Sequence, residues 1–157
     1  MNIFVVDHDP FVAAKMLCDK HVVKMILETA QLLSTAHHLT GSPLACKLYK
    51  MTHKNHPSAV WVRSSKGNYR WALDHLKGLL KEYTFRYNKI HKTSNLLSSL
   101  ESVPDLIDQE DLTEPPQCMY DDCRHPDVVH AYRLYYLTRQ QEIDMRWTKR
   151  DKPNWLT

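Results

Sequence analysis

The stretch from Asp19 to Gln31 carries the side chains of this chain that are best spaced for chemistry. His21, Lys24 and Glu28 follow one another at intervals of three and four residues. In a helix, at about 100° per residue, His21 and Glu28 would lie about 20° apart and two turns from each other. A base, an amine and a carboxylate would then share one face, and such a set could transfer protons or form a covalent adduct through the amine.

The same stretch predicts an amphipathic helix. Its other side collects apolar residues at helical spacing: Val22, Val23, Ile26, Leu27, Ala30 and Leu33. An ordinary solvated face, with Lys24 and Glu28 paired at i,i+4, would explain the polar side equally well. The spacing therefore leaves a catalytic and a purely structural interpretation open.

The elements around this helix are expected to be helical too, in a compact all-α fold. Gly occurs only three times in 157 residues, which disfavours a turn-rich β fold. We predict three main helices at 19–38, 65–89 and 127–146, with short helices at 10–17, 42–51, 57–63 and 93–100. Gly41 is expected to close the first long helix. Residues 3–6 could form a short strand or an extended arm.

Length and composition predict one domain, residues 1–157, with a core that needs neither metal nor disulfides. Four irregularly spaced cysteines argue against a disulfide framework and for a reducing, cytoplasmic setting. Without a two-residue cysteine knuckle, we expect no zinc site and no cofactor. No apolar run approaches the roughly 20 residues that span a bilayer, so we expect no membrane partner.

Charge is segregated along the chain, although the net charge is only +3. Residues 47–92 contain eleven Lys and Arg against two acids, whereas residues 101–127 contain nine acids against one Arg. A basic segment of this kind attracts polyanions, and its interleaved aromatic residues favour a nucleic-acid face over a solvated helix surface. The residues of this segment that we expect to bind DNA are Arg63, Lys66, Arg70, Lys89 and Lys92.

The acidic segment is predicted to form a long loop, because Pro104, Pro115, Pro116 and Pro126 break any helix there. Its carboxylates would repel a phosphate backbone. We therefore expect the acidic loop, residues 101–127, to lie away from the DNA face. Residues 147–157 form a basic C-terminal tail.

Several motifs together resemble the pyrimidine-dimer DNA glycosylases, the phage endonuclease V family. Asp19-Lys20-His21 followed by Glu28 is similar to the family's Asp-x-His with a glutamate seven residues after the His. Asn55-His56-Pro57, the stretch from Glu82 to Ile90, and Lys152-Pro153-Asn154-Trp155 match further family elements in the same order. The chain also resembles a group of phage proteins that begin Met-Asn-Ile-Phe-Val.

The resemblance implies an all-α enzyme that grips bent double-stranded DNA. It further implies that an amino-terminal amine attacks the sugar C1′, expels the base as a Schiff base forms, and cuts the strand by β-elimination. By matched position, Glu28 would be the catalytic carboxylate and His21 its neighbour. The resemblance also implies DNA contacts from residues in the other matched motifs, namely His56, Arg86, Lys152 and Trp155. Met1 would supply the amine, with Lys20 and Lys24 as the alternative nucleophiles.

This sequence departs from the family pattern in two places. Asn2 is bulky, which favours retention of Met1, and the stretch before Asp19 is longer than in the phage enzyme. Leu27 and Gln31 stand where that enzyme has Arg, so Lys20, Lys24 or Arg63 would have to clamp phosphates.

Three functions follow from these residues. The first is a monomeric, pyrimidine-specific DNA glycosylase and lyase in DNA repair. The second is a phage DNA-modification transferase that uses Glu28 as general base on a modified pyrimidine. The third is a non-catalytic DNA-binding protein that would tolerate loss of Glu28.

Overall fold

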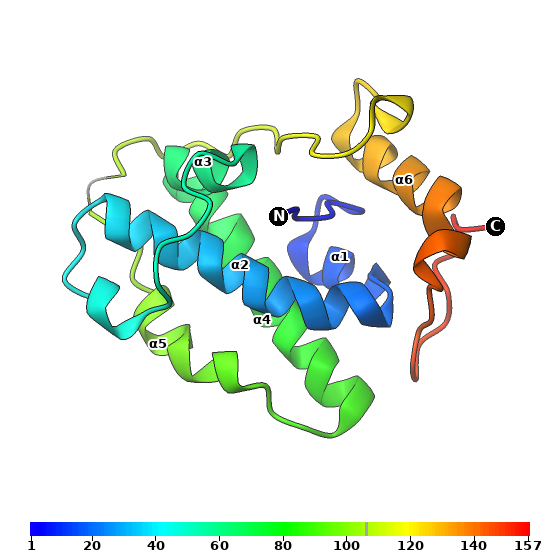
Figure 1. Cartoon of the computed structure of the whole chain (residues 1–157), viewed down its shortest axis with the longest axis horizontal. Helices are drawn as coiled ribbons and strands as arrows, with labels where there is room; N and C mark the ends of the chain where they lie inside the picture. The colour runs from blue at the N-terminus through cyan, green and yellow to red at the C-terminus, as the bar shows by residue number, and fades with distance from the viewer. Residues whose placement is uncertain (106) are drawn as a thin grey trace.

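The computed structural model describes residues 1–105 and 107–157, and all regular elements in these ranges are helical (Figure 1). The helices are α1 (Pro10–Met16), α2 (Asp19–Leu39), α3 (Pro57–Ser64), α4 (Lys66–Tyr87), α5 (Leu97–Leu100) and α6 (Val128–Ile143). Short 3-10 helices are η1 (Ala45–Lys47), η2 (Lys92–Leu96) and η3 (Asp121–Cys123). The predicted all-α class, with α2, α4 and α6 as the long helices, is confirmed.

Local sequence signals start and end several of these helices. The side chain of Asp9 accepts hydrogen bonds from the backbone of the first turn of α1, and Ser65 and Asp127 do the same for α4 and α6. Gly41 follows α2 with a φ of 67°, the left-handed conformation expected there. Each of these boundaries agrees with the predicted one to within a few residues.

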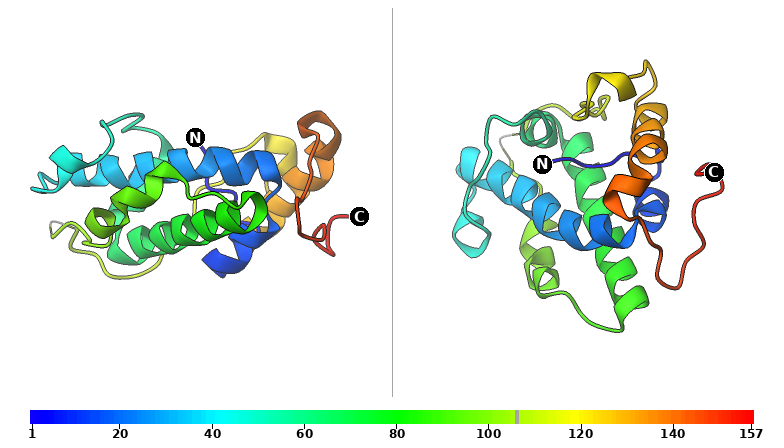
Figure 2. Two further views of the ribbon diagram at one scale, coloured as in Figure 1. Left: turned by 90° about the horizontal axis from the view of Figure 1, so that it is seen from below. Right: turned by 45° about the vertical axis from the view of Figure 1, so that its right-hand side comes forward.

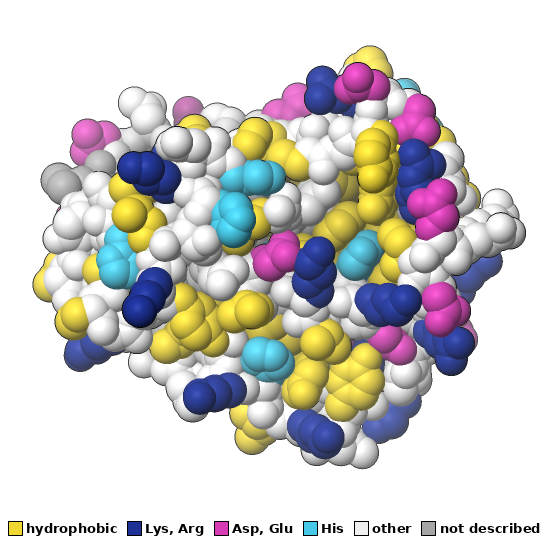
Figure 3. Space-filling view, viewed as in Figure 1, with side chains coloured by type: hydrophobic (Ala, Val, Ile, Leu, Met, Phe, Trp, Pro, Cys, Tyr) yellow, Lys and Arg dark blue, Asp and Glu magenta, His cyan; other side chains and the backbone are white. Residues whose placement is uncertain are grey.

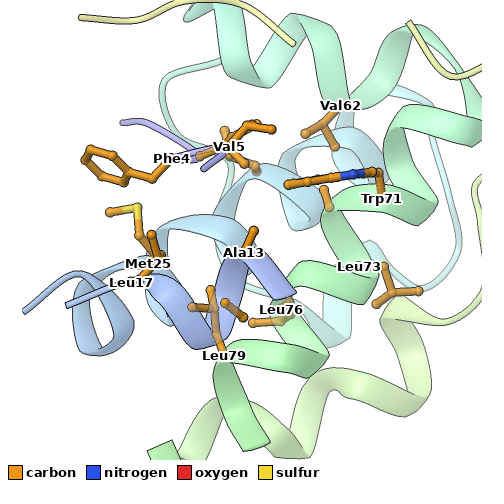
Figure 4. Close-up of a cluster of buried hydrophobic side chains, with 14 of the residues drawn as sticks. Phe4, Val5, Ala13, Leu17, Met25, Val62, Trp71, Leu73, Leu76 and Leu79 are labelled. Carbon is orange, nitrogen blue, oxygen red and sulfur yellow. The ribbon is translucent and has the colours of Figure 1, made fainter. Parts of the chain in front are cut away.

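Helix α4 is central to the packing, because it contacts α1, α2 and α3. Figure 2 shows α2 and α4 as two layers with the N-terminal arm, residues 1–6, running between them. Apolar side chains from these elements, among them Leu17, Met25 and Leu76, meet in the core (Figure 4). At Gly78 a Cβ would lie 2.8 Å from Ala14 Cβ, so only glycine allows α1 to approach α4 this closely.

The N-terminal arm is extended rather than a strand, and its residues Ile3 to Val6 are buried. Phe4 has a φ of 56°, a left-handed conformation that is strained for a bulky residue. Its ring stacks on His21, with centroids 4.0 Å apart, and meets three tyrosines of α6. The arm therefore joins α2 to α6, two elements far apart in the sequence.

The helix expected at 42–51 is wrong, since only the short η1 forms there. The side chain of Ser42 accepts a hydrogen bond from Leu44 N and contacts His37 Nδ1, and so forms a turn. Beyond it, Thr35 of α2 hydrogen-bonds in both directions with the backbone of Thr52. These hydrogen bonds hold the segment against α2. If the segment formed a helix of its own, the bonds would be lost.

The acidic loop is packed on the start of α4. Its backbone carbonyls at Gln109 and Glu110 accept hydrogen bonds from Lys66 N and Gly67 N. A Cβ on Gly67 would lie 2.5 Å from the loop backbone, so glycine is required for this close approach. Residue 106 of the predicted loop lies outside the described residues.

Candidate active site

Glu28 occupies a sheltered position in the third turn of α2. Its side chain is 17% exposed, and Oε1 lies 3.6 Å from Lys24 Nζ. The other oxygen, Oε2, is buried and finds no hydrogen-bond partner among the described residues. Buried polar atoms are almost always partnered, and exceptions concentrate at functional sites. Glu28 therefore has one carboxylate oxygen whose hydrogen-bonding capacity no described residue uses.

The chain's amino terminus and His56 lie close to Glu28. His56 caps α3, and its Nδ1 accepts a hydrogen bond from Ser58 N at 3.1 Å. Burial lowers the pKa of His56, the charges of the N-terminal amine and His53 lower it further, and the Glu28 carboxylate raises it. The amino terminus, His53 and Glu28 thus each act electrostatically on His56, and Figure 1 shows the N-terminus between α2 and α3.

His56 is poised as a hydrogen-bond donor at neutral pH. With Nδ1 used as an acceptor, the proton of the neutral ring sits on Nε2. Its lowered pKa keeps this neutral form dominant near pH 7. The Nε2–H group can therefore donate to a sugar or phosphate oxygen.

His21 is buried rather than presented to solvent beside Lys24. Its side chain is 7% exposed, and Nδ1 lies 2.6 Å from the hydroxyl oxygen of Tyr136. Burial, aided by the charges of Lys24 and Lys20, lowers the pKa of His21 to about 4, so the ring is neutral at pH 7. It supports the N-terminal arm by stacking on Phe4.

The exposed arc of α2 also differs from the prediction. Val23 and Leu27, which we expected to pack inward, are 42% and 44% exposed. The N-terminal arm and α6 cover the side of α2 that carries His21. The exposed side of α2 is therefore centred on Leu27 and not on the line from His21 to Glu28. Lys20 and Lys24 are exposed on this arc, and Lys20 Nζ donates to the carbonyl of Ile143 at 2.6 Å.

The same face of the molecule combines histidine, acidic and basic side chains near its middle, with apolar side chains beside them (Figure 3). Most acidic side chains visible in this view lie toward the upper and right-hand margins. A polyanion could thus approach the centre of this face without crossing a continuous acidic surface.

A cavity of about 720 Å³ opens next to the amino terminus. Asn2, His56 and Pro57 line one side, and Met119 and Tyr135 belong to the other. Proline, methionine and tyrosine side chains offer flat or adaptable apolar contacts. The cavity is therefore suited to a planar, partly polar group held next to the amine.

Four of the residues expected to bind DNA are committed to contacts within the protein. Lys66 Nζ and Arg70 Nη1 bind Glu110 of the acidic loop at 2.7 and 3.4 Å. The acidic loop, which we expected to lie away from the DNA face, thus pairs with two of the cations that we expected to bind DNA. Trp155 donates to Met16 Sδ at 3.4 Å and packs under Arg133.

Arg86 is also structural, and its assignment to DNA is corrected. The side chain is buried and pairs with Glu82 at 3.1 Å and Asp19 at 2.9 Å. It also donates to the carbonyls of Lys15 and Leu17. Its donors thus join α1, α2 and α4 instead of facing a phosphate.

The other expected contacts remain accessible. Lys89, Lys92 and Lys152 are exposed, and His56 is at the site. Arg63 is half-buried and donates to the carbonyl of Lys54 at 2.7 Å, which stabilises the loop before α3.

Sequence reasoning missed three contributors to this site. His53 lies near His56, and its proximity in the sequence was the available signal. Asn2 and Tyr132 form a hydrogen bond across 130 positions, which no local pattern could indicate. Among the described residues, no group of three His, Cys, Asp or Glu could hold a metal ion.

The part of the chain that the structure describes contains no helix with the length and apolarity to cross a membrane. All four cysteines are free thiols in the structure.

Comparison with known families gives one match. A sequence profile described as pyrimidine dimer DNA glycosylase covers residues 1–95 of the 157. This segment holds the amino terminus, Glu28 and His56, and also His21, which supports the N-terminal arm. No curated protein and no solved structure matches the chain. The chain belongs to the pyrimidine dimer DNA glycosylase family.

Proposed function

We propose that this chain excises a pyrimidine base from double-stranded DNA, with the Met1 α-amine as nucleophile and Glu28 as catalytic carboxylate. The observations that carry the proposal are the position of the N-terminus between α2 and α3 (Figure 1) and the charges of the amino terminus and Glu28, which both act on His56. Membership of a DNA glycosylase family supports the same reaction class. We also propose that the protein acts as a monomer.

In the proposed reaction the neutral Met1 amine attacks C1′ of the deoxyribose. The bond between C1′ and the base breaks, and the base leaves with the electron pair and takes up a proton. Loss of a proton from the attacking nitrogen and opening of the sugar give a Schiff base at C1′. Glu28 accepts the proton of the amine and returns it to a leaving group.

Strand cleavage would follow from the Schiff base. Removal of a C2′ proton, with Glu28 as the base, breaks the C3′–O bond and releases the phosphate end. His56 Nε2–H would hold a sugar or phosphate oxygen during these steps, because its Nδ1 is already used by Ser58 N. Water then hydrolyses the Schiff base and frees the amine.

The Met1 amine is favoured over the two lysines by their exposure. Lys20 is exposed, and the Lys24 side chain is 66% exposed. Burial is what would make a lysine amine neutral and nucleophilic near pH 7. Neither lysine has that environment, so we assign them to phosphate contacts.

The excised base must leave the duplex stack to be reached. The cavity beside Asn2 and His56 lies where an unstacked base could enter, and Tyr135 could stack on it. Exposed cations of the same chain, Lys89, Lys92 and Lys152, together with Lys20, Lys24 and Arg63, would hold the phosphates.

Borohydride trapping on a duplex with one abasic site tests the nucleophile directly. Reduction of the Schiff base should give a stable protein–DNA adduct, and peptide mass spectrometry should place it on the Met1 nitrogen. Protein with its amino terminus acetylated should form no adduct. An adduct on Lys20 or Lys24 would contradict the assignment of Met1.

The alternative function, transfer of a group onto a modified pyrimidine, is favoured by the size of the cavity. Cavities of roughly 300–1,000 Å³ suit ligands larger than one pyrimidine ring, and this one is about 720 Å³. In that reaction Glu28 would deprotonate an incoming amine, and no enzyme–DNA adduct would form. Absence of trapping, with modified DNA as product, would replace the glycosylase proposal by this one.

A further inference from the structure

We infer that Asn2 and Tyr132 are positioning residues that hold the Met1 amine in place, so that α6 completes the catalytic site. This inference rests on the proposed function, because it takes the Met1 amine as the nucleophile. Tyr132 lies in α6, beyond residues 1–95 that match the family.

Both polar atoms of the Asn2 side chain form hydrogen bonds within the protein. Its Oδ1 accepts from Tyr132 Oη at 2.7 Å and from Ile3 N at 2.8 Å. Its Nδ2 donates to the carbonyl of Cys118 at 2.8 Å. Because a single peptide unit separates Asn2 from the preceding residue, anchoring this side chain directs the amine.

Tyr132 is itself held in place on the other side of this contact. The side chain is buried, and its hydroxyl oxygen lies 2.8 Å from the carbonyl oxygen of Pro116. The same oxygen accepts a hydrogen bond from Cys118 N at 3.3 Å. Tyr132 thus fastens the end of the acidic loop and the amino terminus to one point on α6.

A second tyrosine, one turn further along α6, supports the arm through His21. Tyr136 Oη lies 2.6 Å from His21 Nδ1, and His21 stacks on Phe4. Phe4 keeps a left-handed φ of 56°, which a bulky residue adopts only where its surroundings enforce it. The arm is therefore held at Asn2 and at Phe4, and both contacts depend on α6.

Two parts of the chain contribute different groups to the proposed site. The reactive groups lie in residues 1–95, whereas the hydroxyl groups that orient the amine come from residues 132 and 136. A flexible amine would spend little time beside C1′, and misplacement by about 1 Å can cost about 100-fold in rate.

Tyr132→Phe in the full chain tests the inference, since it removes only the hydroxyl group. Tyr49→Phe is the matched control, because it removes a tyrosine hydroxyl that contacts Thr93 Oγ1 at 2.7 Å and takes no part in holding the arm. Asn2→Leu removes the other partner and keeps a bulky second residue, so that Met1 is retained.

Two measurements are made on each protein. The first is the rate of borohydride trapping on an abasic duplex at saturating enzyme. The second is the pKa of His56 by NMR titration, which the positive charge of the amino terminus lowers. The NMR measurement needs no activity and reports whether the amine has moved.

We expect Tyr132→Phe and Asn2→Leu to trap at least about tenfold more slowly than the wild type, and to show a raised His56 pKa. Tyr49→Phe should match the wild type in both measurements. Wild-type rates in Tyr132→Phe, or slower trapping with an unchanged His56 pKa, would overturn the inference.

The same experiment separates this inference from the proposed function. If the wild type forms no adduct, the glycosylase proposal fails, and the His56 pKa still shows whether Tyr132 anchors the terminus. If Tyr132→Phe does not fold, Asn2→Leu decides the question by the same two measurements.

Discussion

Glu28 on α2 and Glu110 in the acidic loop are both glutamates beside cations, yet their surroundings differ in kind. The Glu110 side chain is 60% exposed, and its two oxygens bind Lys66 and Arg70. Glu28 is 17% exposed, and its Oε2 has no hydrogen-bond partner among the described residues. An exposed, fully paired carboxylate contributes little, whereas a sheltered carboxylate with an open oxygen can take part in chemistry.

The same contrast separates two basic surfaces. At the start of α4, Glu110 of the acidic loop pairs with Lys66 and Arg70, and the pairing lowers the pKa of Glu110. On α2, Lys20 and Lys24 remain exposed beside the site. The number of cations in the sequence favours the start of α4 as the DNA-binding surface. The tertiary contacts favour α2 instead, because Lys66 and Arg70 are paired with Glu110.

Replacement of each glutamate by glutamine should give the largest difference between the two regions. Glu28→Gln keeps the shape of the side chain and removes its proton transfer, so excision should slow by about 10²–10⁴-fold with DNA affinity retained. Glu110→Gln is the control and should leave the rate unchanged. Single-turnover kinetics on the true substrate measures both, and a fully active Glu28→Gln protein would make Glu28 structural.

Acidification should destabilise the buried side of the site more than the exposed loop. Burial lowers the pKa of His21 and of His75 to about 4, below the ordinary histidine value of 6.5. The unfolded state therefore binds more protons between these values, and stability falls as the pH drops from 6.5 toward 4. Each histidine should contribute about 3 kcal/mol to this loss.

Urea unfolding at a series of pH values measures this dependence. His75→Phe should flatten the slope between pH 6.5 and 4, because it removes one of the two histidines whose pKa burial lowers to about 4. Glu110→Gln should alter the slope in this range much less, since Glu110 is an exposed carboxylate whose ion pairs are screened by solvent. Equal slopes in all three proteins would show that the buried histidines do not control acid stability.

The substitution Gly67→Ala tests whether the acidic loop is tightly packed against α4. The new Cβ would lie 2.5 Å from Leu112 N, and the backbone must shift to relieve the clash. We expect the free energy of unfolding to fall by about 1–3 kcal/mol. A loss below about 0.5 kcal/mol, within the range of ordinary surface substitutions, would mean that the loop is free to move away from Lys66 and Arg70.

Removal of charge in pairs should give the smallest effect and compare the two basic surfaces directly. Lys20→Gln with Lys24→Gln should weaken duplex binding several-fold, and the log–log salt slope should decrease by roughly 0.9 for each phosphate that the protein no longer neutralises. Lys66→Gln with Arg70→Gln should change both less, because Glu110 is paired with these two cations and offsets part of their charge. Fluorescence anisotropy at several salt concentrations measures both pairs, and a larger loss of affinity in the second pair would reverse the assignment of the DNA face.

Local patterns predicted most of the helices, because caps and apolar periodicity act within a few residues. Asp9, Ser65 and Asp127 cap their helices with their own side chains. The predicted helix at 42–51 failed because bonds from α2 to Tyr49 and Thr52 are tertiary contacts. The prediction that Leu27 packs inward was wrong for a similar reason. The N-terminal arm and α6 cover another side of α2, and Leu27 is exposed.

The sequence by itself determined the all-α class, the spacing of His21 and Glu28 on one helix, and the family signature. Those features depend on helical periodicity, which is a local property. The tertiary structure alone decided which cations pair with the acidic loop, that Arg86 is buried, and that the charges of the amino terminus and Glu28 both act on His56. Burial and charge pairing are set by partners up to 130 positions away, as for Asn2 and Tyr132, and no local pattern carries that information.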